Sequence, residues 1–118
     1  MRLIDVLKLL AVLIFSVYPT LTLAAIDGKT LYQLASKYKE FSTNHENPST
    51  SAGTFLGYVT GIATILNIQG KICINEKTSN GKVVDSVQEY IQKNPQFESM
   101  SEGSIVVILA LTESYKCK

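Results

Sequence analysis

Residues 55–63 read FLGYVTGIA, and the pattern around them decides the fold class. An apolar stripe repeats at helical spacing: Phe55, Tyr58, Val59, Ile62, Ile65 and Leu66. A second stripe, with a spacing of four, consists only of glycine: Gly53, Gly57 and Gly61. Both repeats have the period of an α-helix, so we expect a helix over about 52–67. Ser49, Thr50 or Ser51 would cap its start, and Gly70 would end it.

The glycine stripe has a cost, because each glycine destabilises a helix by up to about 1 kcal/mol. Three glycines on one face indicate a place where a second helix approaches closely, and we expect that contact inside the domain core. A dimer face is one alternative. A membrane-spanning helix is another, since residues 49–70 contain no charge. The hydroxyl and amide side chains in this stretch lower its hydrophobicity, so we expect no stable membrane insertion.

Two amphipathic helices flank this one along the chain. The first is expected over about 27–41, capped by Asp27, with an apolar stripe of Leu31, Leu34, Tyr38 and Phe41. The second is expected over about 82–93 and stops at Asn94-Pro95, because a residue before proline avoids the helical region. Its inward positions are Val83, Val84, Val87, Tyr90 and Ile91, and its outward positions are Asp85, Gln88, Glu89 and Gln92. Residues 42–51 are all polar or proline and are expected to form a loop.

The run IVVILAL at 105–111 is apolar on every side. Periodicity alone does not separate a buried helix from a buried strand here, and the β-branched residues favour a strand. However, no second strand is predicted that could satisfy the backbone groups of a lone strand. We therefore expect a fourth, central helix, capped by Ser101, around which the others pack. The predicted fold class is all-α, a small four-helix domain.

Residues 1–24 have the organisation of a secretory signal peptide. Arg2 and Lys8 make the start weakly positive, residues 9–17 are apolar apart from Ser16, and small residues precede Ala25. We expect cleavage after Ala24, which leaves an exported domain at 25–118. An uncleaved anchor is the alternative, but the apolar run is shorter than the roughly 20 residues that a spanning helix needs.

Cys73 and Cys117 are the only cysteines of the chain. In an exported protein an even number of cysteines indicates a disulfide, and here only one intramolecular pairing exists. It would close a loop of about 45 residues and stabilise the fold by roughly 4 kcal/mol. The alternatives are a metal site or a catalytic thiol. A metal site needs more ligands, and His45 is the only histidine on offer.

Composition narrows the function to binding. Arg2, Lys8 and Asp5 precede Ala25, so the exported domain has a net charge of zero, and without a basic stripe nucleic acid is not an expected partner. An enzyme needs positioned acids, bases or nucleophiles. The single histidine lies in a polar loop, and paired cysteines leave no thiolate. We expect no enzyme, no metal and no cofactor, and a binding protein remains.

A set of spaced positions carries a family resemblance: Gly57-Tyr58-Val59-Thr60-Gly61, Cys73, Pro95, Ala110-Leu111, Tyr115 and Cys117. They form a G-Y-x-x-G helix, a cysteine, a helix that ends near proline, and a last helix followed by an aromatic residue and a cysteine. This pattern resembles the Rap/Tai family of periplasmic immunity proteins, which belong to bacterial type VI secretion systems. The chain departs from it at Lys116, where many members have proline.

The resemblance implies a small helical protein of the periplasm that binds a toxin delivered by type VI secretion and blocks it sterically. The best-known targets of the family are amidases that cut peptidoglycan peptides with a cysteine nucleophile. Several members act as homodimers, so pairing with a second copy is a further expectation.

Two polar loops are candidate contacts for such a partner. One contains Asn44, His45, Glu46 and Asn47, and the other contains Glu76, Lys77, Ser79 and Asn80. Cys73 lies close to the second loop, and a rigidly anchored loop loses less entropy on binding, which favours that loop. The alternative for both loops is a plain solvated connector, which is the more common role of any single residue in such a loop.

A periplasmic acid-stress chaperone is the alternative function, because such proteins are also small, helical, exported and disulfide-linked. They expose apolar surface when protonation loosens a dimer. Retained tertiary signals at pH 2 without protection of a client protein would argue against this function. A membrane-embedded accessory protein is a third candidate, and it would resist carbonate extraction.

Overall fold

A computed structural model describes residues 2–17, 25–44 and 49–118 of the chain. Its elements in chain order are α1 (Leu3–Val17), α2 (Gly28–Asn44), α3 (Thr50–Ile68), α4 (Asn80–Lys93), the 3₁₀ helix η1 (Pro95–Ser99) and α5 (Gly103–Ser114). The described ranges contain no strand. The all-α class and the four-helix domain, α2 to α5, are confirmed.

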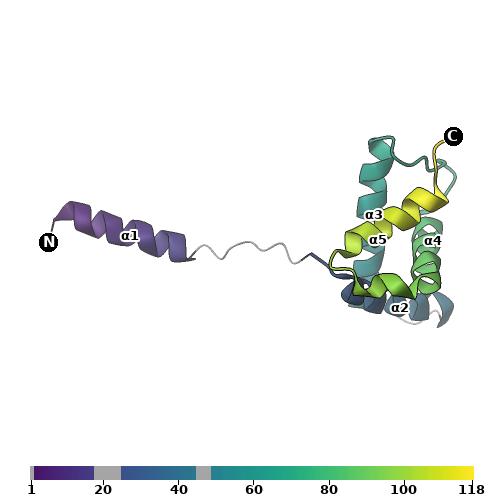
Figure 1. Cartoon of the computed structure of the whole chain (residues 1–118), viewed down its shortest axis with the longest axis horizontal. Coiled ribbons are helices and arrows are strands. Elements are labelled where there is room, and N and C mark those ends of the chain that lie inside the picture. Colours follow the sequence, from purple (N-terminus) through teal and green to yellow (C-terminus); the bar gives the residue numbers. More distant parts are fainter. Residues whose placement is uncertain (1, 18–24, 45–48) are drawn as a thin grey trace.

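Helix α1 stands apart from this domain (Figure 1). Leu3, Leu7, Leu9 and Leu10 are exposed, and every core side chain that the structure describes comes from residues after Ala25. Residues 18–24, where the leader is expected to be cleaved, lie outside the described residues. The signal peptide at 1–24 stays a prediction.

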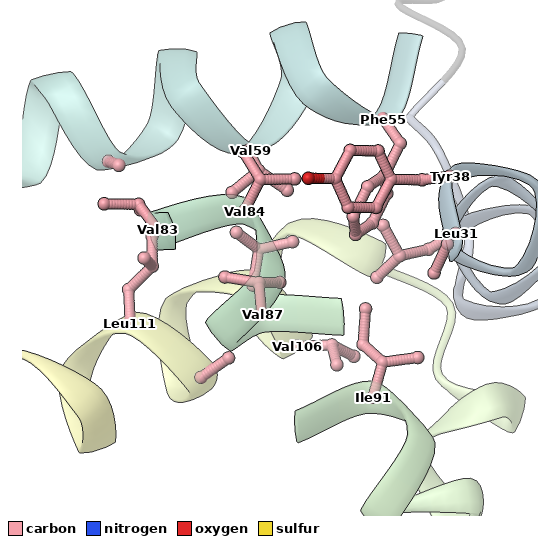
Figure 2. Close-up of a cluster of buried hydrophobic side chains, with 14 of the residues drawn as sticks. Leu31, Tyr38, Phe55, Val59, Val83, Val84, Val87, Ile91, Val106 and Leu111 are labelled. Atoms are coloured by element: carbon pink, nitrogen blue, oxygen red, sulfur yellow. The ribbon is translucent and has the colours of Figure 1, made fainter. Parts of the chain in front are cut away.

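The core forms where the apolar stripes of the four helices meet. In the domain, α3 and α4 run side by side, α5 crosses them, and α2 lies across one end (Figure 1). Figure 2 shows Phe55 of α3, Val87 of α4 and Val106 of α5 converging with Leu31 of α2, and all four are fully buried. Each stripe repeats with the helical period, so one face of every helix is removed from water.

Helix α5 is not buried all round, so the expectation of a central helix is wrong. Its inner side chains are buried: Val106, Val107, Ala110 and Leu111. Its outer side chains Ile105, Ile108 and Leu109 are 42%, 38% and 40% exposed. A domain of this size has too few elements to cover both sides of its last helix.

The helix ends follow the predicted caps in α2 and α3 but not in α5. Asp27 accepts a hydrogen bond from the Thr30 backbone N–H at 2.8 Å, and Ser49 accepts one from the Ala52 N–H at 3.1 Å. Helix α2 continues to Asn44, so residues 42–44 are helical and their prediction as loop is wrong. Ser101 does not cap α5, which begins after Glu102 without a side-chain cap.

A backbone contact replaces the missing cap of α5. The Gly103 N–H donates to the Ile26 carbonyl at 2.7 Å, and the Gly28 N–H donates to the Met100 carbonyl at 2.7 Å. These two bonds, here called the glycine clasp, join the start of α2 to the start of α5. They satisfy N–H groups that a helix start leaves without partners.

The glycine stripe of α3 faces outward, so its predicted packing inside the core is wrong. Gly53, Gly57 and Gly61 are exposed, and a methyl group added to any of them would meet nothing within 4 Å. The buried residues of α3 lie on the opposite side: Ala52, Phe55, Val59 and Ala63. Ile65, expected to face inward, is 58% exposed. The other helices cover a single face of α3, and the glycines lie on the uncovered one.

The prediction that Gln88 of α4 faces outward is also wrong, because its side chain is only 9% exposed. The valines beside it are buried as predicted, and Tyr90 is half-buried. Helix α2 contacts α4 and covers the Gln88 side of that helix. A polar side chain is thereby placed at the edge of the core.

The hydroxyl group of Tyr38 makes the stability of the domain depend on pH in the alkaline range. Its hydroxyl donates to Asp85 Oδ1 at 2.7 Å, and burial, this hydrogen bond and the negative charge of Asp85 raise the pKa of Tyr38 to about 12. An unfolded tyrosine titrates near pH 10. The native chain therefore retains a proton that the unfolded chain loses, and stability falls as pH rises from about 10 towards about 12.

We expect Tyr38→Phe to lower the unfolding free energy by about 1 kcal/mol at pH 8, because the hydrogen bond is lost. Above pH 10 the wild type loses its advantage over Tyr38→Phe, and the gap narrows. Urea unfolding of both proteins at several pH values checks this. Tyr58→Phe is a control for a tyrosine without the bond to Asp85. A gap that is constant up to pH 11 would contradict the assignment.

Candidate functional site

The loop between α3 and α4 begins with a sharp helix end. Gly70 has a φ of 71°, which glycine adopts without strain. Its N–H donates to the Asn67 carbonyl at 3.1 Å, and the Lys71 N–H donates to the Leu66 carbonyl at 2.9 Å. This pair of bonds is a Schellman motif and confirms the predicted role of Gly70.

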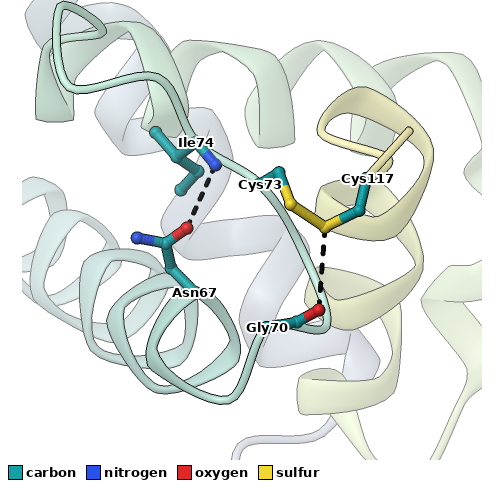
Figure 3. Close-up of a disulfide and its surroundings, with 5 residues drawn as sticks. All are labelled: Asn67, Gly70, Cys73, Ile74 and Cys117. Carbon is teal, nitrogen blue, oxygen red and sulfur yellow. Dashed lines mark hydrogen bonds between the residues drawn. A yellow bond between two sulfur atoms is a disulfide. The ribbon is translucent and has the colours of Figure 1, made fainter.

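The next residues tie the loop to the domain. Ile72 is buried in the core, and the predicted disulfide between Cys73 and Cys117 is confirmed. The Cys73 N–H donates to the Tyr115 carbonyl at 2.9 Å, next to the bridge. The Ile74 N–H donates to Asn67 Oδ1 at 3.0 Å, as Figure 3 shows. Both neighbours of the loop, α3 and the C-terminal segment, thus hold it in place.

The tip of the loop, residues 75–78, is held in a turn by hydrogen bonds to Asn75. Asn75 Oδ1 accepts a hydrogen bond from the Lys77 N–H at 3.0 Å, and the Asn75 carbonyl accepts one from the Thr78 N–H at 2.9 Å. Side-chain and backbone bonds of this kind fix a tight turn. Glu76 and Lys77 are exposed at its apex. The tip therefore presents one acid and one base from a fixed turn.

Two of the predicted contact residues have different roles in the structure. Ser79 caps α4, since its hydroxyl accepts a hydrogen bond from the Lys82 N–H at 3.2 Å. Asn80 is the first residue of α4 and is exposed beside a groove of about 160 Å³. The groove lies between α3 and α4, and Thr64, Ile68 and Ile74 also line it. Asn80 is available to a partner, whereas Ser79 holds the loop in shape.

Sequence reasoning missed Ile68, the most exposed large apolar side chain among the described residues. It is 80% exposed at the end of α3 and lines the groove beside the tip. A signal was present, because Ile68 follows Gly61 by seven residues and so shares the face of the glycine stripe. That face was interpreted as buried, which concealed the exposure of Ile68.

Only one residue of the second candidate loop, Asn44, is among the described residues. Asn44 is exposed at the end of α2, and His45, Glu46 and Asn47 lie outside the described residues. Ser49, the next described residue, lies at the opposite end of α3 from Gly70, and a helix of this length spans roughly 27 Å at 1.5 Å per residue.

The remaining chemistry of the site is sparse. Within the described ranges, no three His, Cys, Asp or Glu side chains lie close enough to hold a metal ion. By length and composition alone, α3 could cross a membrane. Its inner face is part of the domain core, however, and its outer face is uncharged. The site offers a fixed turn, one exposed isoleucine and a shallow groove, which suit contact with a protein.

The comparison with known families identifies the chain. The profile of the Rap1a immunity proteins matches residues 27–117. The chain belongs to the Rap1a immunity proteins. The matched region runs from the Asp27 cap to Cys117, so it includes all four domain helices, both glycines of the clasp and the disulfide. No curated protein and no solved structure matches this Rap1a chain.

Membership of the Rap1a family confirms the resemblance seen in the spaced glycines and cysteines. It indicates a toxin-immunity role, with a cognate toxin protein as the binding partner. Rap1a immunity proteins are generally not enzymes, and an extracytoplasmic location is consistent with immunity to secreted toxins.

Proposed function

We propose that the domain at 25–118, released from its signal peptide, acts in the periplasm against a toxin delivered by type VI secretion. The toxin is a peptidoglycan amidase, and the domain blocks its substrate groove by binding rather than by catalysis. The family match and the signal-like residues 1–24 support this proposal. The domain itself carries no resident metal or cofactor in this mechanism.

The observation that carries the proposal is the anchored tip beside Ile68. The tip is held by the disulfide, by the Asn67–Ile74 hydrogen bond and by the Ser79 cap. A contact that is already ordered loses little conformational entropy on binding. Ile68 adds an apolar side chain of the kind that anchors an interface when it is desolvated. Together they offer the toxin a fixed, exposed turn and an apolar side chain.

The first experiment is a pulldown of the oxidised domain against a library of secreted peptidoglycan amidases, followed by hydrolysis assays. Tight one-to-one binding that abolishes cleavage is the expected result. A binder that remains fully active would contradict inhibition by groove blocking. No binder in the library would contradict the amidase as partner and would bring the chaperone alternative forward.

Variants of the surface locate the contact. We expect Ile68→Asp to weaken binding of the amidase by at least about thirtyfold, which is the threshold of a hot spot at about 2 kcal/mol. Lys77→Glu should weaken it less, because charges at the rim of an interface contribute little. The control is Thr54→Asp, an exposed change at the other end of α3. Equal effects of Ile68→Asp and Thr54→Asp on affinity would place the contact elsewhere.

We also propose that two copies pair through the outer face of α3, the alternative role of the glycine stripe. Leu56 and Ile65 are 39% and 58% exposed on the two edges of this face. No charge lies between Ser49 and Gly70, so two identical faces meet without like-charge repulsion. The absence of side chains at Gly53, Gly57 and Gly61 lets two helix backbones approach closely.

Gly57→Leu tests this pairing, because a leucine in the centre of the stripe separates the two backbones. We expect the variant to elute as a monomer in size-exclusion chromatography with light scattering, while its unfolding midpoint at low concentration stays the same or rises, because leucine favours a helix more than glycine does. Lys37→Leu on α2 is a control that adds the same side chain elsewhere on the surface. A wild-type domain that is monomeric at millimolar concentration would exclude the pairing.

A further inference from the structure

A cavity of about 220 Å³ lies between α2 and α4. Its lining includes Ala35, Ser36 and Lys39 from α2 and Gln88, Ile91 and Gln92 from α4. These α4 residues belong to its last two turns, whereas the candidate tip precedes its first turn (Figure 1). The volume equals the share of about seven water molecules, enough for a group the size of a side chain. The cavity is therefore separate from the surface proposed for the toxin.

Gln88 gives this cavity a polar wall. It is 9% exposed, and its amide nitrogen donates only one hydrogen bond, to Gln92 Oε1 at a long 3.4 Å. Its amide oxygen accepts no hydrogen bond from any described residue. Among the described residues, however, every side-chain oxygen that is fully buried has a hydrogen-bond partner, so the Gln88 oxygen is not fully buried. The oxygen therefore keeps some contact with solvent, and Gln88 is one of the residues that line the cavity. Such a group is costly to bury unless something in the cavity bonds to it.

Lys39 supplies the charge. Its ammonium group donates to Gln92 Oε1 at 2.7 Å, the same oxygen that Gln88 approaches. No carboxylate lines the cavity, and the one ion pair among the described residues joins Lys37 to Glu40. The nearby Asp85 is occupied by the Tyr38 hydroxyl. The cavity thus combines one cation with amide donors and has no anion of its own.

The remaining walls are apolar or small. Ile91 is 3% exposed and Ala35 is 2% exposed, and both belong to the core. A short hydrocarbon stem packed beside them would have its own apolar surface removed from water, which is worth about 25 cal/mol per Å². The requirements for a ligand are then an anionic oxygen, a short aliphatic stem and a donor for the Gln88 oxygen.

We propose that this cavity binds the carboxylate of an acidic residue or of a small acid. The carboxylate pairs with the Lys39 ammonium group and with the second N–H of the Gln88 amide, which makes no hydrogen bond to a described residue. The stem packs on Ala35 and Ile91. In an acidic residue, a backbone N–H next to the stem can donate to the Gln88 oxygen. Charge-assisted hydrogen bonds of this kind are the stronger ones in proteins.

The test uses the domain at 25–118, whose described core contains no residue before Ile26. The ¹⁵N-labelled domain is titrated with N-acetyl-glutamate methylamide, with its neutral counterpart N-acetyl-glutamine methylamide, and with butyrate. Saturable shifts of the Gln88 and Gln92 side-chain amide signals are expected with the first probe, at a millimolar Kd, and not with the neutral one. Similar binding of butyrate would identify a small acid as the source, and weaker binding of butyrate an acidic residue.

Matched variants separate the site from nonspecific attraction. Lys39→Gln should weaken binding of the glutamate probe about tenfold. Lys37→Gln makes the same change on the same helix, but Lys37 is paired with Glu40, so this variant should bind the probe as the wild type does. Gln88→Met removes the amide and should abolish the shift at Gln92. If Gln88→Met fails to fold, Lys39→Gln alone decides, because Lys39 is exposed. Equal shifts with the two methylamides, or equal losses in the two lysine variants, would overturn the proposal.

Discussion

Replacing Cys73 with serine is expected to lower the free energy of unfolding by roughly 4 kcal/mol, and Cys117→Ser should have the same effect. The two cysteines lie 44 residues apart, so the bridge encloses α4, η1 and α5. Without it, the unfolded chain regains the entropy of this loop. The loss approaches the lower end of the total stability typical of a domain, about 5–15 kcal/mol.

The double variant decides the mechanism. Both single changes break the same bond, so Cys73→Ser with Cys117→Ser should cost no more than either change alone. Urea unfolding of the three variants and of the wild type, with and without a reductant, measures this. Losses that add would mean that the cysteines stabilise the fold separately. Ser114→Ala, an exposed change close to Cys117, is the control for disturbance of the C-terminal segment.

Substitutions in the glycine clasp are expected to cause the second large loss of stability. A methyl group on Gly28 would lie 2.7 Å from the carbonyl oxygens of Phe97 and Glu98, and one on Gly103 would lie 2.7 Å from that of Ile26. These neighbours are backbone atoms that cannot rotate away. We expect Gly28→Ala and Gly103→Ala each to destabilise the domain by about 3 kcal/mol, at the upper end for overpacking. Both clasp hydrogen bonds would have to lengthen.

Gly81→Ala is the matched control, because a methyl group there meets nothing within 4 Å. Gly81 lies in the first turn of α4, where alanine should be neutral or stabilising by up to about 1 kcal/mol. Thermal unfolding of the three variants compares them directly. If Gly103→Ala unfolded at the same temperature as Gly81→Ala, the close approach of α2 and α5 would not exist in solution.

Most helices of the domain could be predicted from local patterns. The Ser49 cap, the Gly70 end and the stop at Asn94 lie where the residue types require them. The disulfide also followed, because two cysteines in an exported chain allow one intramolecular pairing. The exposure of Glu76 and Lys77 at the loop tip also followed from the polar residues of this turn. The other loop contributes only Asn44 to the described residues.

Other features depended on which faces the helices cover. The same periodicity that predicts α3 is compatible with glycines packed inside or exposed outside, and only the positions of α2, α4 and α5 place them outside. Gln88 is buried because α2 passes over it, although its neighbours in sequence give no sign of that. The exposure of Ile68 was not predicted, because its face of α3 was expected to be covered and no helix covers it.

The sequence by itself determined the helical class, the helix caps, the single disulfide and the family pattern of glycines and cysteines. Each of these depends on a residue and its near neighbours, or on a pairing with one solution. The tertiary structure decided the outward glycine face, the glycine clasp and the cavity at Gln88. These depend on contacts between segments far apart in the chain, and the helical period says that a face exists without saying what covers it.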